Sequence, residues 1–175
     1  MHVKIKNRGT KMICQSKDFY IDLVESRDLN DIIEVYNSNK QFLLNHMGSD
    51  MVEYKWVIEE LALMKKINFY SCKVVLKSSN KIIGIIDFKL GEETYLSLLM
   101  IHNDYKNKGF GKLIYEALEE YVKSIKSRVI RIDVVTNYDN RVFNFWIRNG
   151  FNKFKDAKLN WTGKVLPALI MKKSL

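Results

Sequence analysis

A short segment near the middle of the chain has residue types and spacing that suit a phosphate group. It reads Tyr105-Lys106-Asn107-Lys108-Gly109-Phe110-Gly111-Lys112. Gly109 and Gly111 stand at the expected start of a helix, where a missing Cβ lets the backbone approach a ligand closely. The first-turn amides of a helix lack partners within the helix and lie at the positive end of its dipole. Lys106, Lys108 and Lys112 add full charges, so the segment predicts phosphate binding, the alternative being an ordinary loop-to-helix junction in a lysine-rich chain.

Other sites that bind nucleotides or metals do not match. A dinucleotide fingerprint needs a third glycine near Ile114, and a P-loop needs Gly-Lys followed by Ser or Thr. The two cysteines, Cys14 and Cys72, form no CxxC pair, and the three histidines (His2, His46 and His102) have no ligand spacing such as HExxH. We therefore expect neither a metal site nor a disulfide framework.

The elements that flank the phosphate segment are a strand and a helix. Tyr95 to Ile101 is nearly continuous in apolar residues, which predicts a central strand covered on both faces. From Gly109 to Lys126, apolar residues recur at helical spacing along one face, and charged residues occupy the other. A strand that leads into a glycine-rich helix start is the arrangement that a phosphate site requires.

The rest of the chain predicts a mixed α/β protein. We expect strands over 19–24, 69–76, 81–90, 129–135, 151–158 and 165–171, and helices over 29–36, 51–66 and 139–149. Asp50 with Glu53 forms a capping-box pattern at the start of the second helix. Val3 to Ile5 can also pair with Lys11 to Cys14. The resulting order, β-α-α-β-β-β-α-β-α-β-β, is that of an α/β sandwich.

Composition sets the class of protein. The chain has 175 residues, 47% of them hydrophobic, which predicts a single domain over residues 1–175 with an additional N-terminal hairpin within 1–16. No apolar run reaches the roughly 18 residues of a membrane helix, and the start lacks the apolar stretch of a signal peptide. We therefore expect a cytoplasmic protein without a membrane partner.

The chain is basic, with 29 Lys and Arg against 20 Asp and Glu and a formal net charge of +9. The basic residues are scattered along the chain, and no aromatic RNA-binding signature accompanies them, which argues against nucleic acid as the partner. A nucleic-acid-binding domain stays as an alternative whose affinity would fall steeply with salt. Positive charge gathered locally around a phosphorylated cofactor is the third interpretation.

Two blocks of sequence together resemble the GNAT N-acetyltransferase superfamily. The segment 99–111, LMIHNDYKNKGFG, resembles the family's acetyl-CoA motif, Q/R-x-x-G-x-G/A at a helix start. The segment 134–151, VVTNYDNRVFNFWIRNGF, is similar to the second block, an Asn-led helix with an aromatic residue and then Gly-Phe. The resemblance implies a twisted, mostly antiparallel sheet, with helices on both faces and a central parallel pair of strands splayed for CoA.

The resemblance also implies a coenzyme site. The backbone of Leu99 and Ile101 would bind pantetheine, a neighbouring amide would polarise the thioester carbonyl, and amides 107–112 would hold the pyrophosphate. The implied cofactor-binding residues are Leu99, Met100, Ile101, Lys106, Asn107, Lys108, Gly109, Phe110, Gly111, Lys112, Asn137, Asn140 and Asn144. Acetyl-CoA is the implied co-substrate, and no metal is implied.

The sequence departs from the family pattern at several positions. Lys106 stands where Gln or Arg is usual, and Asp139 stands where Asn is usual, with Asn140 beside it. Trp146 stands where many members have the tyrosine that protonates the thiolate, and an indole N–H is no usable acid, so Trp146 either contacts the coenzyme sulfur or packs in the core. Tyr95 stands where the histone-acetylating branch has a glutamate.

The general base and the general acid are therefore open. The candidate catalytic residues are Glu93, Tyr95 and Trp146, with Glu92 and Asp87 as further carboxylates close in sequence. The predicted function is direct transfer of an acetyl group from acetyl-CoA to an amine of a small molecule or a protein. The alternative is a non-catalytic acyl-CoA-binding module of the same fold. The predicted acceptor pocket comprises the two early helices, the hairpin 69–90 and the loop 161–164, and a homodimer is consistent with the family.

Overall fold

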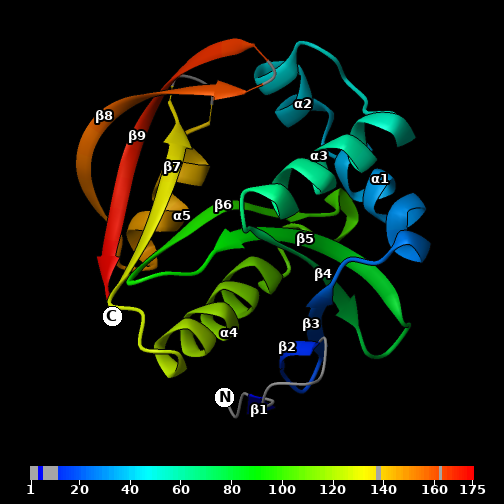
Figure 1. Cartoon of the computed structure of the whole chain (residues 1–175), viewed down its shortest axis with the longest axis horizontal. Helices are drawn as coiled ribbons and strands as arrows, with labels where there is room; N and C mark the ends of the chain where they lie inside the picture. The colour runs from blue at the N-terminus through cyan, green and yellow to red at the C-terminus, as the bar shows by residue number, and fades with distance from the viewer. Residues whose placement is uncertain (1–3, 6–11, 137–138, 162) are drawn as a thin grey trace.

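A computed structural model describes residues 4–5, 12–136, 139–161 and 163–175 of the chain. Its centre is a nine-stranded sheet with the order β1-β2-β3-β4-β5-β6-β7-β9-β8 (Figure 1). The strands are β1 (Lys4–Ile5), β2 (Met12–Gln15), β3 (Phe19–Leu23), β4 (Tyr70–Leu76), β5 (Lys81–Lys89), β6 (Glu93–Ile101), β7 (Val129–Val135), β8 (Asn152–Trp161) and β9 (Lys164–Ser174). Every neighbouring pair is antiparallel except β6 and β7, which are parallel. The mixed, mostly antiparallel sheet is thereby confirmed.

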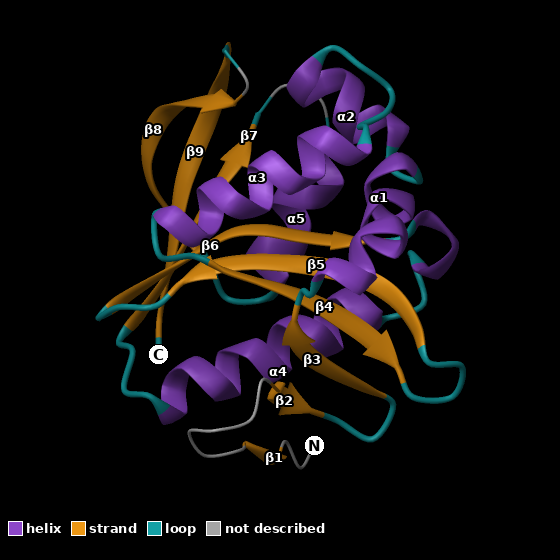
Figure 2. Cartoon of the chain, turned by 45° about the vertical axis from the view of Figure 1, so that its right-hand side comes forward, coloured by secondary structure: helices purple, strands orange, loops and turns teal. Residues whose placement is uncertain are grey.

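Helices cover both faces of the sheet (Figure 2). They are α1 (Leu29–Asn37), α2 (Lys40–Met47), α3 (Tyr54–Lys66), α4 (Phe110–Ser124) and α5 (Asn140–Arg148), with 3-10 turns η1 (Ser26–Asp28) and η2 (Asn103–Tyr105). One apolar core lies under α4 and α5 and includes Ile114, Leu118 and Trp146. A second core lies under α1 to α3 and includes Ile32, Leu43 and Val57.

The N-terminal pairing is confirmed for the described residues, because β1 pairs antiparallel with β2. The turn predicted at Asn7-Arg8-Gly9 lies outside the described residues. Most other elements agree with the prediction within a few residues, although β8 and β9 together extend further than expected, to Trp161 and Ser174.

The predicted helix over 51–66 is wrong at its start. A separate helix, α2, precedes it and ends where Gly48 adopts a left-handed φ of 79°. Asn37 then holds the following segment in a non-helical path, since it accepts from the Val52 amide (2.7 Å) and donates to the Val52 carbonyl (3.1 Å). Consequently α3 begins at Tyr54 with Glu53 as N-cap, and its capping-box pattern at Asp50 is not used.

Strands β6 and β7 diverge soon after they pair. Their parallel register is limited to three rungs, the last of which joins Tyr95 and Arg131. On its other side β6 carries a bulge at Ser97, because Leu96 opposes Phe88 while Leu98 opposes Asp87. The expectation that β6 is covered on both faces is confirmed, because Leu98 and Met100 lie in the core under α1 to α3, and Leu99 and Ile101 pack against the core under α4 and α5. On its β7 side, the pairing of β6 ends at Tyr95.

Candidate functional site

A cavity of about 790 Å³ lies where β6, the start of α4 and α5 meet. Strand β6 contributes Leu99 and Ile101, the two residues at which pantetheine binding was predicted. The remaining lining residues are Tyr105, Lys106, Asn107, Gly109, Gly111, Lys112, Asp139, Arg141, Val142, Phe145, Trp146, Arg148 and Asn149. The two sequence blocks that were matched separately therefore form one cavity.

The loop at the edge of this cavity has a left-handed backbone conformation at Gly109, which a glycine adopts readily. Gly109 is the N-cap of α4 with φ of 83°, and a Cβ there would meet no atom within 4 Å, so the glycine serves the left-handed backbone. Because Gly109 has no side chain, it cannot cap the amides of the first turn. These amides are suited to a phosphate oxygen.

Gly111 has a different role from Gly109. A Cβ at Gly111 would lie 3.6 Å from Ile101 Cδ1 and 3.6 Å from the Phe145 ring, in ordinary van der Waals contact. The first turn of α4 thus passes close to both β6 and α5. A side chain larger than a methyl group at this position would enter the space between them.

Positive charge gathers around the cavity. Lys106, Lys112, Arg141 and Arg148 all line it. Partial desolvation and the nearby Arg141 lower the pKa of Lys106, although Asp139 opposes this. Cations whose repulsion shifts a pKa in this way are stabilised by a bound anion, which is what a pyrophosphate provides.

Asp139, the departure from the usual asparagine, caps α5. Its Oδ1 accepts a hydrogen bond from the Arg141 amide (2.9 Å), and its carboxylate pairs with the Arg141 guanidinium at 3.0 Å. The hydrogen bond to Arg141 is the main reason that the pKa of Asp139 is lowered. Asp139 therefore holds Arg141 at the edge of the cavity.

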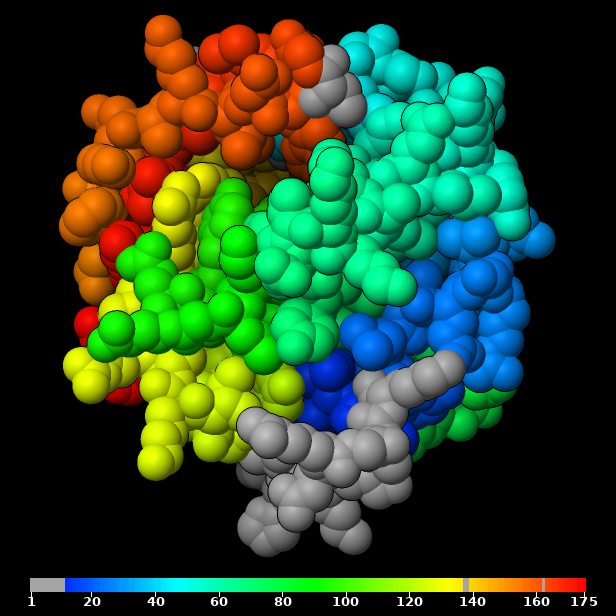
Figure 3. Space-filling model, viewed as in Figure 1, coloured from blue at the N-terminus to red at the C-terminus, as the bar shows by residue number. Residues whose placement is uncertain are grey.

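A second, smaller hollow of about 100 Å³ lies between the diverging strands β6 and β7. It shares Leu99, Val142 and Trp146 with the large cavity, so the two adjoin at these side chains. The other lining residues are Phe42, His46, Leu96, Ser97, Leu98, Ile132, Asp133, Val134, Val135, Leu159 and Trp161. Figure 3 shows the surface hollowed between the orange-red β8–β9 hairpin and the turquoise α3.

His46 is one wall of this hollow and is 4% exposed. Its ring stacks on Phe42 at a centroid distance of 3.9 Å and lies edge-on to Trp161 at 5.3 Å. Nδ1 carries a hydrogen, because it lies 2.9 Å from the Phe42 carbonyl oxygen, which can only accept. Burial lowers the pKa of His46, and the charge of Lys164 lowers it further, so the ring is neutral at physiological pH.

Asp133 provides a carboxylate in the hollow. Its side chain is 9% exposed, and its Oδ1 and Oδ2 accept from Arg131 Nε (2.9 Å) and Nη2 (2.8 Å). The Tyr95 hydroxyl, 3.2 Å away, also donates to Oδ2. Burial and the neighbouring Asp133 raise the pKa of Tyr95, so this phenol acts as a hydrogen-bond donor and not as a base.

Trp146 packs in the core and also reaches both cavities. It is 8% exposed and contacts Tyr115, Phe145 and Phe151 edge-on at centroid distances of 5.5, 4.8 and 5.2 Å. Both interpretations of Trp146 are therefore compatible, since a packed indole also lies where the two cavities adjoin.

The other carboxylates considered from sequence lie outside both cavities. Glu93 Oε2 pairs with Lys172 Nζ at 2.5 Å, and Glu92 pairs with Arg128 at 3.1 Å. Asp87 is 2% exposed, and burial raises its pKa to about 7, with Glu60 adding to the rise. Asp87 touches the site only through its backbone, since its carbonyl accepts from Ser97 Oγ at the bulge (3.1 Å).

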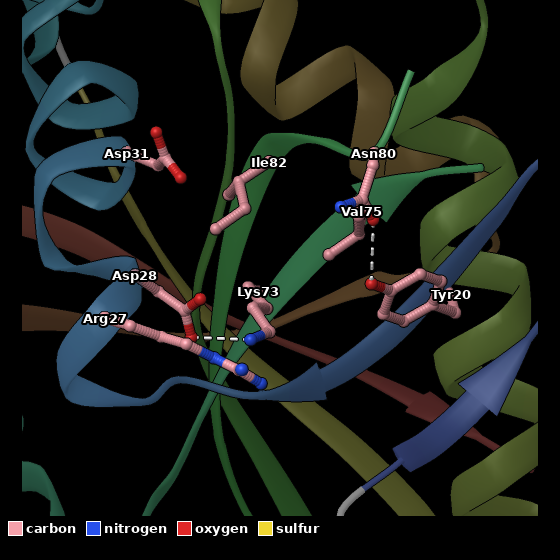
Figure 4. A pocket seen from close by; sticks show the side chains of 8 residues that line it. All are labelled: Tyr20, Arg27, Asp28, Asp31, Lys73, Val75, Asn80 and Ile82. Carbon is pink, nitrogen blue, oxygen red and sulfur yellow. Dashed lines mark hydrogen bonds and ion pairs between the residues drawn. The ribbon is translucent and has the colours of Figure 1, made fainter. Parts of the chain in front are cut away.

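A separate polar pocket of about 350 Å³ lies between β3, η1, α1 and the β4–β5 hairpin (Figure 4). Lys73 Nζ points to Asp28 Oδ2 at 2.5 Å, and both side chains are almost fully buried. Asp28 Oδ2 also accepts from the Glu25 amide (2.7 Å), which closes the capping box of η1. The Lys73 and Asp28 charges at the base of this pocket neutralise each other, and their ion pair links η1 to strand β4.

The remaining predicted residues lie at various distances from the cavity. Met100 faces the core under α1 to α3, and Phe110 packs against Tyr105 at a centroid distance of 6.2 Å. Lys108, Asn140 and Asn144 are exposed and are not among the lining residues. Asn137 lies outside the described residues. Residues 69–90 do not line the small hollow, whereas Trp161 does.

Sequence reasoning missed several lining residues. Phe42 and His46 belong to a helix that was not predicted, and Asp133 lies within a strand that was assigned by its apolar pattern alone. Arg141 and Arg148 were inside a matched block, and their positive charge was the signal that could have identified them.

The described residues form neither a metal cluster nor a membrane-spanning helix. Within the parts of the chain that the structure describes, no group of three or more His, Cys, Asp and Glu side chains is arranged to hold a metal ion. Across the same residues, no helix combines the length and apolarity needed to cross a membrane.

Solved structures share this fold. An acetyltransferase from Thermus thermophilus superposes with a TM-score of 0.71 at 21% identity, covering 90% of this chain and 97% of that one. The ribosomal-protein-S18-alanine N-acetyltransferase from Escherichia coli gives 0.68 at 15% identity, with 89% and 93% covered. A PaiA N-acetyltransferase from Thermoplasma acidophilum in complex with coenzyme A gives 0.63 at 18% identity, with 90% and 99% covered.

Sequence comparison gives the family directly. No curated protein sequence matches the chain significantly. A family model described as Acetyltransferase (GNAT) family matches residues 30–151, which include β6, the glycine loop and α5. The match covers well over half of the chain and both matched sequence blocks. The chain therefore belongs to the GNAT family of acetyltransferases.

Proposed function

We propose that this single-domain enzyme transfers the acetyl group of acetyl-CoA to an amine of a small molecule or a protein by direct attack. The observation that carries the proposal is the junction of two cavities at Leu99, Val142 and Trp146, between strands β6 and β7. The large cavity suits the coenzyme, and the small hollow suits the acceptor. An amine in the hollow would then lie beside the thioester without any covalent enzyme intermediate.

Several groups fit the coenzyme. The cations Lys106, Lys112, Arg141 and Arg148 and the uncapped start of α4 suit its phosphates. On the β7 side, no strand pairs with β6 at Leu99 and Ile101, which leaves backbone groups on that edge to pair with pantetheine amides. Asn107 at the loop and the exposed Asn140 and Asn144 remain proposed contacts for the outer part of the coenzyme.

The chemistry follows from these positions. Bound acetyl-CoA would supply a thioester: as the amine nitrogen bonds to the carbonyl carbon, the carbon–sulfur bond breaks and coenzyme A leaves as a thiolate, which takes up a proton to give the thiol. A backbone amide of β6 near the bulge at Ser97 would be the donor that stabilises negative charge developing on the carbonyl oxygen. Trp146 shields the same point from water. The acceptor must lose a proton before it attacks. Because Glu93, Glu92 and Asp87 lie outside both cavities, these carboxylates do not contact an acceptor in the small hollow.

Calorimetric titration with acetyl-CoA, followed by a thiol-release assay with a panel of amines, tests the proposal. Coenzyme at about 100 times its Kd should raise the free energy of unfolding by about 2.7 kcal/mol. Binding with amine-dependent thiol release supports transfer, and binding without release for any amine supports the non-catalytic module. Absence of binding to acetyl-CoA contradicts the proposal.

A further inference from the structure

The small hollow is largely apolar and aromatic, with one acidic side chain among its described lining residues. That residue is Asp133 of β7. Continuing the parallel register two residues beyond the Tyr95–Arg131 rung places Asp133 level with Ser97, the bulge residue of β6. The carboxylate therefore lies where the two strands begin to separate.

The carboxylate is held in one orientation by three hydrogen bonds. Arg131 binds both oxygens, and the Tyr95 hydroxyl binds Oδ2. Oδ1 accepts one of these bonds, and a carboxylate oxygen can accept two, so Oδ1 retains capacity for a further donor. Because Arg131 also lies over the Tyr95 ring at 4.9 Å, the whole arrangement is preorganised.

Three aromatic rings form another part of the lining. Phe42 and His46 stack, and Trp161 lies edge-on to both at 5.4 and 5.3 Å. Aromatic faces attract an organic cation and its carbon substituents. The positive charge of Lys164 of β9 acts on the His46 imidazole, and Lys164 Nζ donates to the Asn45 carbonyl (2.7 Å). Asp133 lines the same hollow as His46. The lining side chains of β6, α5 and β8 are uncharged.

We propose that Asp133 binds the ammonium group of the acceptor, and that the acceptor is a compact primary amine with an apolar or aromatic body. This inference rests on the proposed function, since it assigns the acceptor to the small hollow. The volume of about 100 Å³ suits an amine carried on a single ring, whereas a long polyamine would have to extend out of it. Asp133 is a specificity-determining residue, and Arg131 and Tyr95 are positioning residues. The ammonium that Asp133 binds must give up one proton to solvent before its nitrogen attacks the thioester.

The test measures amine kinetics and coenzyme binding separately. Benzylamine is the probe, with thiol release as the readout for KM and kcat and calorimetry for the Kd of acetyl-CoA. Asp133→Asn keeps the shape and removes the charge, so KM for benzylamine should rise by about tenfold or more, equivalent to about 1.4 kcal/mol. The Kd of acetyl-CoA should stay unchanged, because Asp133 does not line the large cavity.

Asp156→Asn is the matched control, since Asp156 is an exposed residue of β8 outside the hollow. It should leave the KM for benzylamine unchanged. If wild-type protein binds acetyl-CoA and does not acetylate benzylamine, or if Asp133→Asn leaves KM unchanged, the inference is wrong while the coenzyme site stands. If the wild-type protein does not bind acetyl-CoA, the proposed function is contradicted instead.

A measurement on the wild-type protein remains decisive if Asp133→Asn fails to fold. Benzyl alcohol has the size and shape of benzylamine without its charge. Its inhibition constant should be at least about ten times the KM of benzylamine, because an ion pair to a buried carboxylate is available only to the ammonium. Equal values for the two compounds would overturn the role of Asp133.

Discussion

The Tyr95 hydroxyl donates a hydrogen bond to Asp133 Oδ2 at 3.2 Å, linking the last parallel rung of β6 and β7 to a residue two positions further along β7. In this chain, the carboxylate at the gap between the strands comes from β7, whereas the resemblance implies a glutamate at the Tyr95 position of β6 in the histone-acetylating branch of the family. Tyr95, which stands at the β6 position, orients that carboxylate.

Tyr95→Phe should lower the free energy of unfolding by about 1 to 2 kcal/mol, because it removes one donor from a largely buried carboxylate. Urea unfolding measures the loss. Tyr20→Phe is the control, since the Tyr20 hydroxyl makes a longer bond, 3.4 Å, to the exposed Asn80. An equal loss in both variants would show that the Asp133 bond is not special.

Gly109→Val should weaken acetyl-CoA binding by at least about tenfold, because a branched side chain at the start of α4 would occupy the approach to the first-turn amides. Gly48→Val is matched to it: both glycines have φ near 80°, 83° and 79°, and at neither position would a Cβ meet an atom within 4 Å. The two variants share the backbone strain, so the difference in Kd by calorimetry isolates the ligand contact. Similar Kd values would contradict the phosphate assignment.

Asp87→Asn should change how stability depends on pH. Burial raises the pKa of Asp87 to about 7, so ionising it in the folded state is unfavourable. The free energy of unfolding that the raised pKa of Asp87 contributes is fully present below the unfolded-state pKa of about 4. It is lost as the pH rises to about 7. The variant should therefore lose less stability than wild type between those pH values, by up to about 4 kcal/mol. Parallel pH curves from urea unfolding would contradict this.

Lys73→Met should lower the free energy of unfolding by about 3 to 5 kcal/mol, because it leaves the Asp28 carboxylate buried without its partner. The double variant Lys73→Met with Asp28→Asn should lose less, since the uncompensated charge is gone. Lys55→Met is the control, because its pair with Glu59 is exposed and 3.8 Å long. Equal losses for Lys73→Met and Lys55→Met in thermal unfolding would refute the buried-pair argument.

The coenzyme side of the site was predictable because its signals are local. Gly109, with a left-handed φ, and the lysines around it are contiguous in sequence, and the periodicity of α4 fixes where the helix starts. The strand–loop–helix order then places these groups at one edge of the sheet.

The acceptor side was not predictable, because it is assembled from distant parts of the chain. Helix α2 has a weak amphipathic pattern, and the tertiary contacts between Asn37 and Val52 separate it from α3. Asp133 gains its place only through the register of β6 against β7 and the divergence beyond it. No pattern within β7 itself distinguishes such a residue from an ordinary strand carboxylate.

Both cysteines lie inside the sheet, Cys14 on β2 and Cys72 on β4, and neither side chain reaches solvent. Burial raises the pKa of Cys14 to about 12 and that of Cys72 as well, so neither forms a thiolate at neutral pH. Disulfide dyes that colour on reaction with thiols therefore have no accessible target on the folded protein. The folded enzyme therefore does not react with such a reagent. Any colour that develops with acetyl-CoA and an amine comes from the thiol of released coenzyme A.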